Sequence, residues 1–343
     1  MVSLQAIRKS NARVAELPEG LVALFLGATS GIGQSALIQF AQYAVRPRIY
    51  IVARRASATK PLLAELRAKN PGATYTVIEK DVSLICETND VVEFVKARET
   101  KLDRLFESVG FISFTGRQET AEGLEPSMTT RYYSRLRAVQ GLLPLLNAAA
   151  SPRVVSILAG GMEAKMNETD LDLRKPGNYS IAGAAVHSAT MLTLAYEHLA
   201  RENPRISFVH AYPGLVATPI LSRGSTGLLR LLMTWIVIPL ATLFATSVED
   251  AGARALFYLT SDRYSVGNGT VPLPEGIEKS PRTQGGIFLS NAKSESVGNE
   301  KLLADFRARG VDEQVWRHTM EIFDACAANA PNQATKGSQR SQT

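Results

Sequence analysis

The sequence predicts an α/β fold with a doubly wound parallel sheet, and two observations carry this prediction. From residue 21 onward, short apolar runs alternate with helical stretches of about 10–15 residues, a pattern typical of β-α-β units. The first apolar run also ends directly in a glycine-rich turn that opens a helix. A chain of 343 residues that is 45% hydrophobic has ample apolar material for such a core.

The expected elements follow one another in a regular order. LVALFL at 21–26 is a short and wholly apolar run, as expected of a parallel strand that is buried on both faces. Further strands are expected at 48–53, 74–79, 102–108, 153–158 and 205–212. Helices are expected at 31–43, 61–69, 88–99, 127–148, 184–202 and 248–259. Helices that connect parallel strands imply right-handed crossovers.

The remaining segments are expected to frame a single sheet domain. In chain order we expect a helix within 1–19, the sheet domain at 20–262 with an apolar lid at 219–246, a helical extension at 263–328 and a disordered tail at 329–343. The first helix is predicted to be amphipathic, from about Leu4 to Glu16. The tail is rich in Asn, Gln, Ser and Ala and has no apolar period, which indicates disorder.

The sequence does not decide whether one apolar segment, 227–246, packs within the protein or contacts a membrane. Its length is close to the ~20 apolar residues that span a bilayer. However, Arg230 lies near its start, Pro239 divides it, and the α/β pattern continues on both sides. We therefore expect a buried or interfacial lid helix, with peripheral membrane contact through 227–246 as the alternative.

Charge and cysteine content exclude several classes of protein. The 38 Lys and Arg against 32 Asp and Glu give a net charge of +6, and the two signs are interspersed, so no nucleic-acid partner is expected. Cys86 and Cys326 cannot form a disulfide framework, and four His without Cys-x-x-Cys spacing argue against a metal site. With no apolar signal-peptide region at the N-terminus, the sequence indicates a reduced, cytoplasmic protein.

The glycine-rich turn predicts a dinucleotide site. Gly27 permits a tight turn after the first strand, Gly31 lets the backbone approach a pyrophosphate, and Gly33 allows close packing of helix and strand. The helix N-terminus then offers free N–H groups to the anion. The predicted cofactor-binding residues of this turn are Gly27, Thr29, Ser30, Gly31, Ile32 and Gly33.

The end of the second strand favours NADP(H) over NAD(H). An acid at this position binds the ribose hydroxyls of NAD, whereas an Arg accommodates the 2′-phosphate of NADP. The sequence here has Arg54 and Arg55 after Ala53, with no acid nearby. The alternative is that the two arginines form a solvated basic corner without a ligand.

Two motifs carry a resemblance to a known family: the glycine turn and Pro213-Gly214-Leu215-Val216-Ala217-Thr218. Through them the chain resembles the short-chain dehydrogenase/reductase family over roughly residues 20–262. The resemblance implies a Rossmann-type sheet with NAD(P)H across the carboxyl ends of the strands. It implies further cofactor contacts at Asp81 and Val82 beside the adenine, at Gly110, and at Pro213, Gly214, Val216 and Thr218 beside the nicotinamide.

The catalytic half of the family pattern is degenerate. Members typically carry a Ser after the fifth strand, and a Tyr with a Lys four residues later on the next helix. Ala159 stands at the Ser position. Either Tyr179 or Ser180 occupies the Tyr position, so Gly183 or Ala184 replaces the Lys.

Three side chains are the candidate catalytic residues. Tyr179 is the positional proton donor, although a turn tyrosine explains it equally well. Arg131, which falls where the family has an active-site Asn, could stabilise an enolate or anchor a carboxylate. Tyr133 is the third, because Tyr132 and Tyr133 differ in direction by about 100° and at most one should face the cleft. His187 is expected to be a core residue.

Two classes of enzyme remain after these observations. The first is an NADP(H)-dependent oxidoreductase that acts on a bulky apolar ketone or alcohol, similar to a divergent branch found in fungal secondary-metabolite clusters. The second is a non-redox isomerase or cyclase on the same fold, with Arg131 and nearby acids such as Glu163, Asp170 and Asp172. A non-catalytic binding subunit is a third alternative. The resemblance also suggests a homo-oligomer through the long helices, a packing that the lid and the extension could block.

Overall fold

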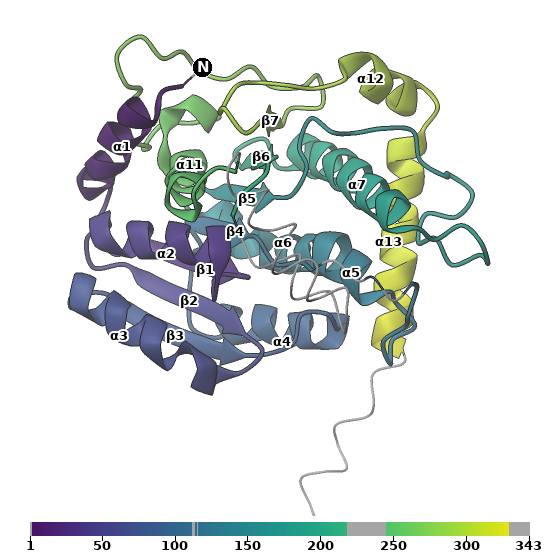
Figure 1. Ribbon diagram of the computed structural model, residues 1–343, viewed down its shortest axis with the longest axis horizontal. Helices are drawn as coiled ribbons and strands as arrows, with labels where there is room; N and C mark the ends of the chain where they lie inside the picture. Colours follow the sequence, from purple (N-terminus) through teal and green to yellow (C-terminus); the bar gives the residue numbers. More distant parts are fainter. Residues whose placement is uncertain (1, 112–113, 115, 218–244, 329–343) are drawn as a thin grey trace, which may run out of the picture.

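The computed structural model describes residues 2–111, 114, 116–217 and 245–328. Within this part of the chain, seven parallel strands form one sheet in the order β3-β2-β1-β4-β5-β6-β7 (Figure 1). The strands are β1 (Val22–Leu26), β2 (Arg48–Ala53), β3 (Thr74–Glu79), β4 (Arg104–Glu107), β5 (Arg153–Ile157), β6 (Ser207–Ala211) and β7 (Phe288–Ser290). The order reverses direction between β1 and β4, which is the switch point where open α/β sheets bind ligands.

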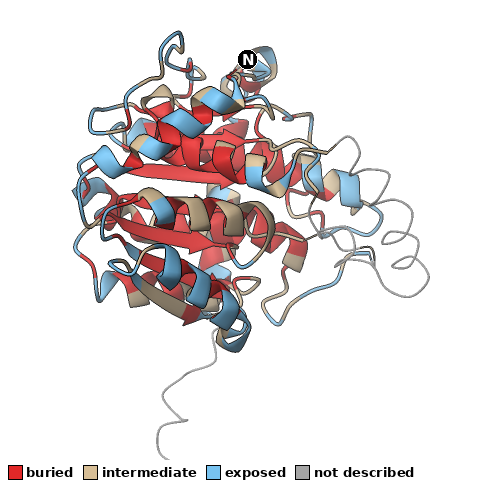
Figure 2. Cartoon of the chain, turned by 60° about the vertical axis from the view of Figure 1, so that its left-hand side comes forward, coloured by how far each residue is buried: buried red, intermediate tan, exposed pale blue. Residues whose placement is uncertain are grey.

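Helices cover both faces of the sheet, as the sequence predicted. One face carries α2 (Gly31–Tyr43), α3 (Lys60–Lys69) and α11 (Val248–Thr260). The other carries α4 (Ile85–Lys96), α6 (Ser134–Ala148) and α7 (Ile181–Glu202). Strands β1, β4, β5 and β6 are buried along their whole length, whereas the helices expose their outer faces (Figure 2).

Two further layers lie outside these helices. The N-terminal helix α1 (Leu4–Ala12) continues into a 3-10 turn at Arg13–Glu16, and its Asn11 side chain donates to the Ala253 carbonyl of α11 at 2.9 Å. On the opposite face lie α12 (Glu300–Ala308) and α13 (Val311–Ala328), and α13 packs along α7 (Figure 1). The N-terminal helix expected from Leu4 is present, but the α-helix ends at Ala12 and a 3-10 turn replaces its expected last turn.

The expected domain boundary at 262 is wrong in one respect. β7 lies within the segment expected to be a helical extension, yet it pairs with β6 and completes the sheet. The Tyr212 amide also donates to the Ser290 carbonyl at 2.8 Å. The segment 263–328 is thus part of the sheet domain at β7 and a separate helical layer only at α12 and α13.

The helix expected at 127–148 is divided into three pieces. A short helix, α5 (Pro126–Met128), leads into a π-helical turn at Thr129–Tyr133, and α6 follows from Ser134. In the π turn the Ser134 amide reaches back five residues to the Thr129 carbonyl. Such turns widen the helix and frequently occur at functional sites.

Helix α13 occupies the face of α7 that points away from the sheet. Trp316 of α13 stacks on His198 of α7 with ring centroids 4.1 Å apart, and Arg201 pairs with Asp312 at 3.0 Å. The oligomer that we expected through the long helices would have to displace this contact or pack beyond it. No partner chain tests that expectation.

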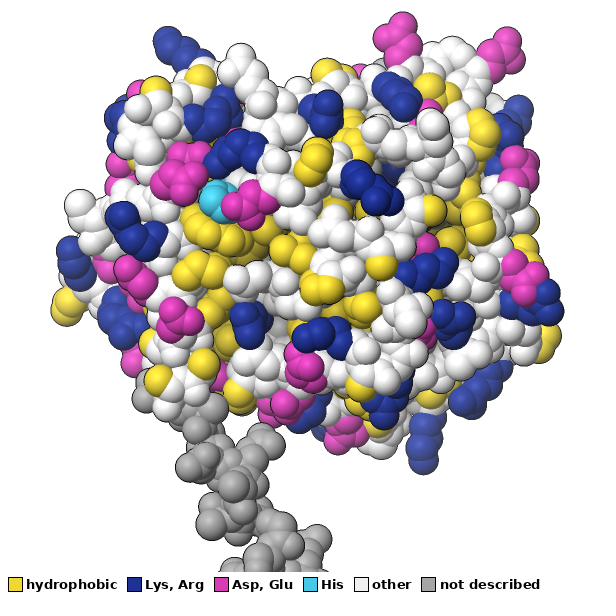
Figure 3. All heavy atoms as spheres, turned by 180° about the vertical axis from the view of Figure 1, so that it is seen from behind, with side chains coloured by type: hydrophobic (Ala, Val, Ile, Leu, Met, Phe, Trp, Pro, Cys, Tyr) yellow, Lys and Arg dark blue, Asp and Glu magenta, His cyan; other side chains and the backbone are white. Residues whose placement is uncertain are grey.

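The surface and the apolar segment bear on two other expectations. Basic and acidic side chains are interspersed over the face seen in Figure 3, in keeping with the scattered charge of the sequence. No helix in the described residues is long and apolar enough to cross a membrane. Most of the expected lid (residues 219–244) and the expected disordered tail lie outside the described residues.

Candidate active site

The glycine turn lies at the switch point, pressed against the loop that follows β4. A Cβ placed on Gly27 would lie 2.3 Å from the Val109 amide nitrogen, and Gly27 has a φ of +83°. The Ser108 hydroxyl donates to the Gly27 carbonyl at 3.0 Å. Only glycine fits here, because both the conformation and the space exclude a side chain.

The same contact extends into α2. A Cβ on Gly33 would lie 2.3 Å from the Ser108 Oγ, so this glycine lets the helix approach the strand ends closely. Gly31 has a φ of +59° and opens the helix, with Ser30 at the N-cap. Thr29 is exposed and Ile32 is half-buried against the core. The structure therefore brings the predicted residues of the turn together at one helix N-terminus.

Arg54 and Arg55 are exposed at the carboxyl end of β2. The structure adds an acid that local sequence did not indicate: Glu79 of β3 lies opposite Ala53 in the sheet. Its Oε2 accepts a hydrogen bond from the Ala56 amide at 2.7 Å. The carboxylate is thus engaged in holding the turn that carries the two arginines.

The other expected cofactor residues lie at the ends of β3 and β6. Asp81 follows β3 and accepts from the Ser83 amide at 3.0 Å, and Val82 is buried beside it. After β6, Gly214 has a φ of +73°, and a Cβ there would lie 2.7 Å from the Ala292 side chain. Pro213 is half-buried, Val216 forms a parallel bridge to Thr246, and Thr218 lies outside the described residues.

These residues fit a nicotinamide dinucleotide. Gly27 and Gly33 let the turn pack closely against the loop after β4, and the N-terminus of α2, which Gly31 opens, has free amides that could bind a pyrophosphate. Asp81, Gly110 and Gly214 follow β3, β4 and β6, so all three lie at the carboxyl edge of the sheet. A dinucleotide lying along this edge would contact each of them.

Arg131 lies in the π turn, with its stem over Gly110. A Cβ on Gly110 would lie 3.8 Å from the Arg131 Cγ, and Nη2 donates to the Phe111 carbonyl at 3.2 Å. The side chain is buried, and Nη1 has no hydrogen-bond partner among the described residues. Burial lowers the pKa of Arg131, while Glu125 and Tyr179 act in the opposite direction. A buried donor is therefore available beside Tyr179.

Tyr179 lies just before α7, whose N-cap is Ser180. Burial raises the pKa of the Tyr179 phenol, the nearby Glu125 carboxylate raises it further, and the Arg131 guanidinium lowers it. Tyr179 accordingly keeps its proton through the neutral range.

Glu125 is a member of this cluster that the sequence reasoning missed. It is buried, and its Oε2 accepts the Met128 amide at 2.7 Å as the N-cap of α5. Its Oε1 is buried without a hydrogen-bond partner in the described part of the chain. An acid followed by Pro126 is an N-cap signal that the sequence did contain.

Tyr133 does not belong to the candidate site, which corrects our expectation. It is 1% exposed, and its hydroxyl lies 2.9 Å from the His318 Nε2 of α13. The neighbouring Tyr132 contacts Thr319 of the same helix at 2.6 Å. Both tyrosines therefore pack the extension onto the domain, and Tyr133 has no access to a substrate.

The residues after β5 form a buried hydrogen-bond chain. The Ala159 amide donates to the His210 Nε2 at 3.0 Å, so the ring proton sits on Nδ1 and donates to Thr193 Oγ1 at 2.9 Å. Thr193 in turn donates to Glu163 Oε1 at 2.7 Å. Burial lowers the pKa of His210 to about 3, so the ring is neutral. The chain holds Ala159 in place and supplies no group that reaches a substrate.

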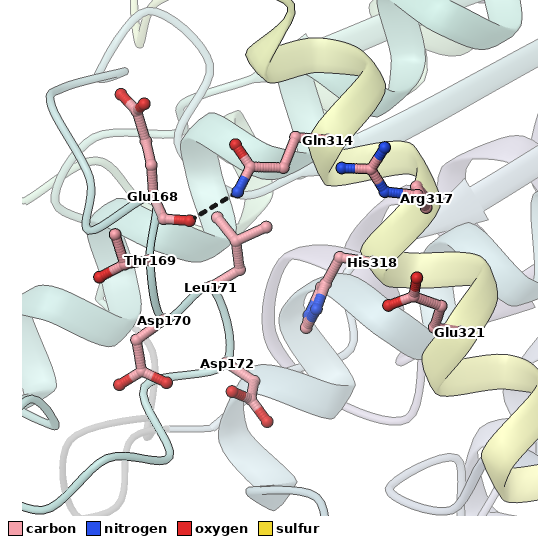
Figure 4. Close-up of a pocket in the computed structure, with 9 residues that line it drawn as sticks. All are labelled: Glu168, Thr169, Asp170, Leu171, Asp172, Gln314, Arg317, His318 and Glu321. Carbon is pink, nitrogen blue, oxygen red and sulfur yellow. Dashed lines mark hydrogen bonds between the residues drawn. The ribbon is translucent and has the colours of Figure 1, made fainter.

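The remaining acids and His187 have structural partners. Asp170 accepts from Asn178, from Arg174 and from Lys175, and Asp172 pairs with Arg174. Together with α13 these acids line a polar cavity of about 250 Å³ (Figure 4). His187 accepts from the Asn167 amide at 3.0 Å and is a buried core residue, as expected.

Comparison with known proteins places the chain in a family. Residues 21–227 match the family described as short chain dehydrogenase. The chain is 51% identical to the NmrA-like family domain-containing oxidoreductase notO of Aspergillus sp. (strain MF297-2), over 95% of this chain and 96% of that protein. It is 40% identical to the oxidoreductase AN1596 of Emericella nidulans, over 94% and 98% of the two chains.

Two further comparisons agree with this placement. The short-chain dehydrogenase/reductase SAT2 of Stachybotrys chartarum is 31% identical over 95% of this chain and 98% of its own length. The crystal structure of levodione reductase shares the fold with a TM-score of 0.55 and 20% identity, over 76% of this chain and 98% of that one. The chain belongs to the short-chain dehydrogenase/reductase family and is an oxidoreductase of that type.

Proposed function

We propose that the chain is an NADP(H)-dependent reductase of a bulky apolar carbonyl compound. The observation that carries this proposal is the pairing of a protonated Tyr179 with the buried Arg131 guanidinium at the carboxyl edge of the sheet. With its pKa raised, the phenol is protonated at neutral pH, which is the form that can donate a proton to a carbonyl oxygen.

The side chains would act on the carbonyl oxygen of the substrate. The nicotinamide, when bound, supplies the hydride. Tyr179 donates its phenolic proton to the oxygen. The Nη1 group of Arg131, which has no partner among the residues that the structure describes, stabilises the negative charge that develops there. Arg131 is also a cation beside Tyr179 that lowers the phenol pKa, the effect that a Lys has in other members of the family. The site can thus work without the missing Ser and Lys.

The preference for NADP(H) rests on Arg54 and Arg55. Both are exposed at the end of β2, where a 2′-phosphate would lie, and the neighbouring Glu79 carboxylate is engaged by the Ala56 amide. The relatives from Aspergillus and Emericella are named oxidoreductases, which supports the same reaction class. The apolar sequence at 219–246 supports a bulky apolar substrate, and the resemblance to fungal cluster enzymes supports a secondary-metabolite intermediate.

Titration calorimetry with NADPH and NADH tests the cofactor. We expect NADPH to bind at least about tenfold more tightly, a difference of ~1.4 kcal/mol. The double variant Arg54→Ala, Arg55→Ala should remove that preference while leaving the NADH affinity unchanged. Lys60→Ala, which removes an exposed cation just beyond this turn, is the control. Tighter binding of NADH by the wild-type protein would contradict the cofactor assignment.

Consumption of NADPH tests the reaction. With 9,10-phenanthrenequinone as a bulky apolar dicarbonyl probe, we expect loss of NADPH absorbance in step with loss of the quinone. Quinone-independent NADPH loss is the background to subtract. If NADPH binds but a panel of bulky apolar ketones and diketones leaves it unoxidised, the reductase assignment is wrong.

A non-redox isomerase or cyclase remains the second candidate. The observation that favours it is Glu125, a buried acid whose carboxylate lies beside Tyr179 and Arg131. A carboxylate base with a cation next to it could move a proton without a hydride acceptor. Product formation in the absence of both nucleotides would select this function over the reductase.

A further inference from the structure

Arg135 is a buried cation that the proposed chemistry does not use. It lies one turn after Arg131 and is 1% exposed. Its guanidinium donates to five acceptors: the Thr130 carbonyl at 3.1 Å, the Glu107 carbonyl at 3.1 Å, the Ile157 carbonyl at 3.0 Å, the Val109 carbonyl and the Ser156 hydroxyl. Burying a guanidinium is costly, and this many acceptors is what makes it tolerable.

The five acceptors belong to three separate parts of the site. Thr130 lies in the π turn that carries Arg131, and a π turn leaves carbonyl groups without regular helical partners. Glu107 and Val109 lie at the end of β4 and in the loop after it. Ser156 and Ile157 end β5. One side chain therefore ties together the π turn and two neighbouring strand ends.

The loop after β4 is also the surface against which the glycine turn packs. The Val109 amide faces Gly27, and the Val109 carbonyl, on the same residue, accepts from Arg135. Gly110 then lies between the two arginines, with its would-be Cβ 3.8 Å from the Arg131 Cγ and 3.9 Å from the Arg135 Nη2. A shift of the Arg135 guanidinium would move both the floor of the cofactor site and the turn that carries Arg131.

We propose that Arg135 is a positioning residue, which fixes the 108–110 loop against the glycine turn and holds Arg131 in place for the reaction. The inference rests on the proposed function, since it concerns the same cofactor and the same Arg131. Its loss should weaken NADPH binding and slow turnover together. A residue that merely stabilised the fold would lower the melting temperature without these effects.

The opposite edge of the sheet offers a matched control. Arg153 begins β5 and is also fully buried, with Nη1 donating to the Tyr258 carbonyl at 2.9 Å and to the Ser261 carbonyl at 2.6 Å. It therefore makes the same kind of contacts as Arg135 but at the amino ends of the strands, away from the cofactor edge. Arg→Lys at either position keeps the charge and removes the planar fork that reaches several carbonyls.

The experiment compares R135K with R153K in the full chain. NADPH affinity is measured by calorimetry, turnover with 9,10-phenanthrenequinone, and stability by thermal unfolding, with binding assayed well below each melting temperature. We expect R135K to raise the NADPH Kd about tenfold or more and to lower kcat by at least a similar factor. R153K should lower the melting temperature while its Kd and kcat stay within about twofold of wild type.

Each outcome decides the inference. Wild-type affinity and turnover in R135K would overturn it, and so would equal losses in R153K, which would show an effect of stability. Failure of the wild-type protein to bind either nucleotide would overturn the proposed function and this inference with it. If R135K does not fold, S156A replaces it, because it removes one acceptor of the same guanidinium.

For S156A the control is S207A, which removes a buried strand hydroxyl at the amino end of β6, where Ser207 accepts the Val266 amide at 3.0 Å. A weaker NADPH affinity in S156A than in S207A supports the positioning role. Equal affinities in these two variants contradict it.

Discussion

The two halves of the site are built from different material. In the cofactor half, Gly27 and Gly33 bring backbone against backbone and against Ser108, so that no side chain fits at either glycine. The proposed catalytic half consists of side chains: Arg131, Tyr179 and Glu125 lie together where the π turn approaches the segment before α7. The sequence predicts that the first half keeps the family pattern and that the second lacks the family's Ser and Lys.

This contrast follows from what each half requires. A close backbone approach has one solution, glycine, so a change there damages the fold of the turn itself. A cation or proton donor can be supplied from another position, provided that the scaffold holds it. We propose that Arg131 supplies the cation from the π turn, while Gly183 or Ala184 stands at the position expected for the Lys.

Gly27→Ala should have the largest effect of any single substitution in the cofactor half. The new methyl would lie 2.3 Å from the Val109 amide in a backbone conformation that disfavours it. We expect the NADPH Kd to rise by about 100-fold or more, measured by calorimetry. Gly276→Ala is the matched control, because Gly276 has a φ of +73° and nothing lies near its Cβ position. Equal loss of binding in both variants would mean that backbone strain, and not the contact with the loop, is responsible.

Tyr179→Phe tests the proposed catalytic half, and it should change the rate of turnover and not the affinity for NADPH. Removing the proton donor should lower kcat by about 10²–10⁴-fold and leave the NADPH Kd unchanged. Tyr133→Phe is its control, since that hydroxyl contacts His318 and should cost only about 1 kcal/mol of stability. The rate is followed as NADPH consumption. Loss of cofactor affinity in Tyr179→Phe would contradict the proposal that the two halves have separate roles.

Most of the sheet could be predicted because short stretches of sequence indicate most of its strands. Six of the strands lie in segments that contain apolar runs, and each was expected within a few residues of its observed bounds. β7 was missed because three residues, Phe288–Ser290, carry no pattern of their own and are defined by pairing with β6. The π turn was missed for a related reason: it carries no local sequence signal, and its Thr130 carbonyl accepts from Arg135, which also contacts the end of β5.

The candidate site was predictable where backbone chemistry sets it. The spacing of glycines at a strand-to-helix turn is enough to predict a dinucleotide site. The position of Glu125 beside Tyr179, by contrast, depends on the packing of its segment against α7. The assignment of Tyr133 could have been avoided from the sequence. Arg131 and Tyr133 are two positions apart on a helix, and residues with that spacing do not share a face.

The titration of Glu107, a buried carboxyl group beside Arg135, should affect how the free energy of unfolding depends on pH. Glu107 is fully buried, and burial raises its pKa to about 8, partly offset by Arg135 and by Tyr196. Between the ordinary value near 4.5 and about 8, the folded state holds a proton that the unfolded state has released. This group therefore contributes its full stability below pH 4.5 and loses it progressively as the pH rises to 8.

Glu107→Gln removes that titration and keeps an acceptor for the Tyr196 hydroxyl, which donates to Glu107 Oε2 at 2.6 Å. Relative to wild type, the variant should gain stability with rising pH between 4.5 and 8, by at most about 1.4 kcal/mol for each pH unit. Chemical denaturation at several pH values measures this difference. Glu93→Gln, on the exposed face of α4, should show no such slope. A difference that does not change with pH would mean that Glu107 is ionised in the folded protein. The Glu107 carboxylate and the Arg135 guanidinium would then balance each other's charge. The region around Arg135 would carry no net buried charge to distinguish it from the cofactor half.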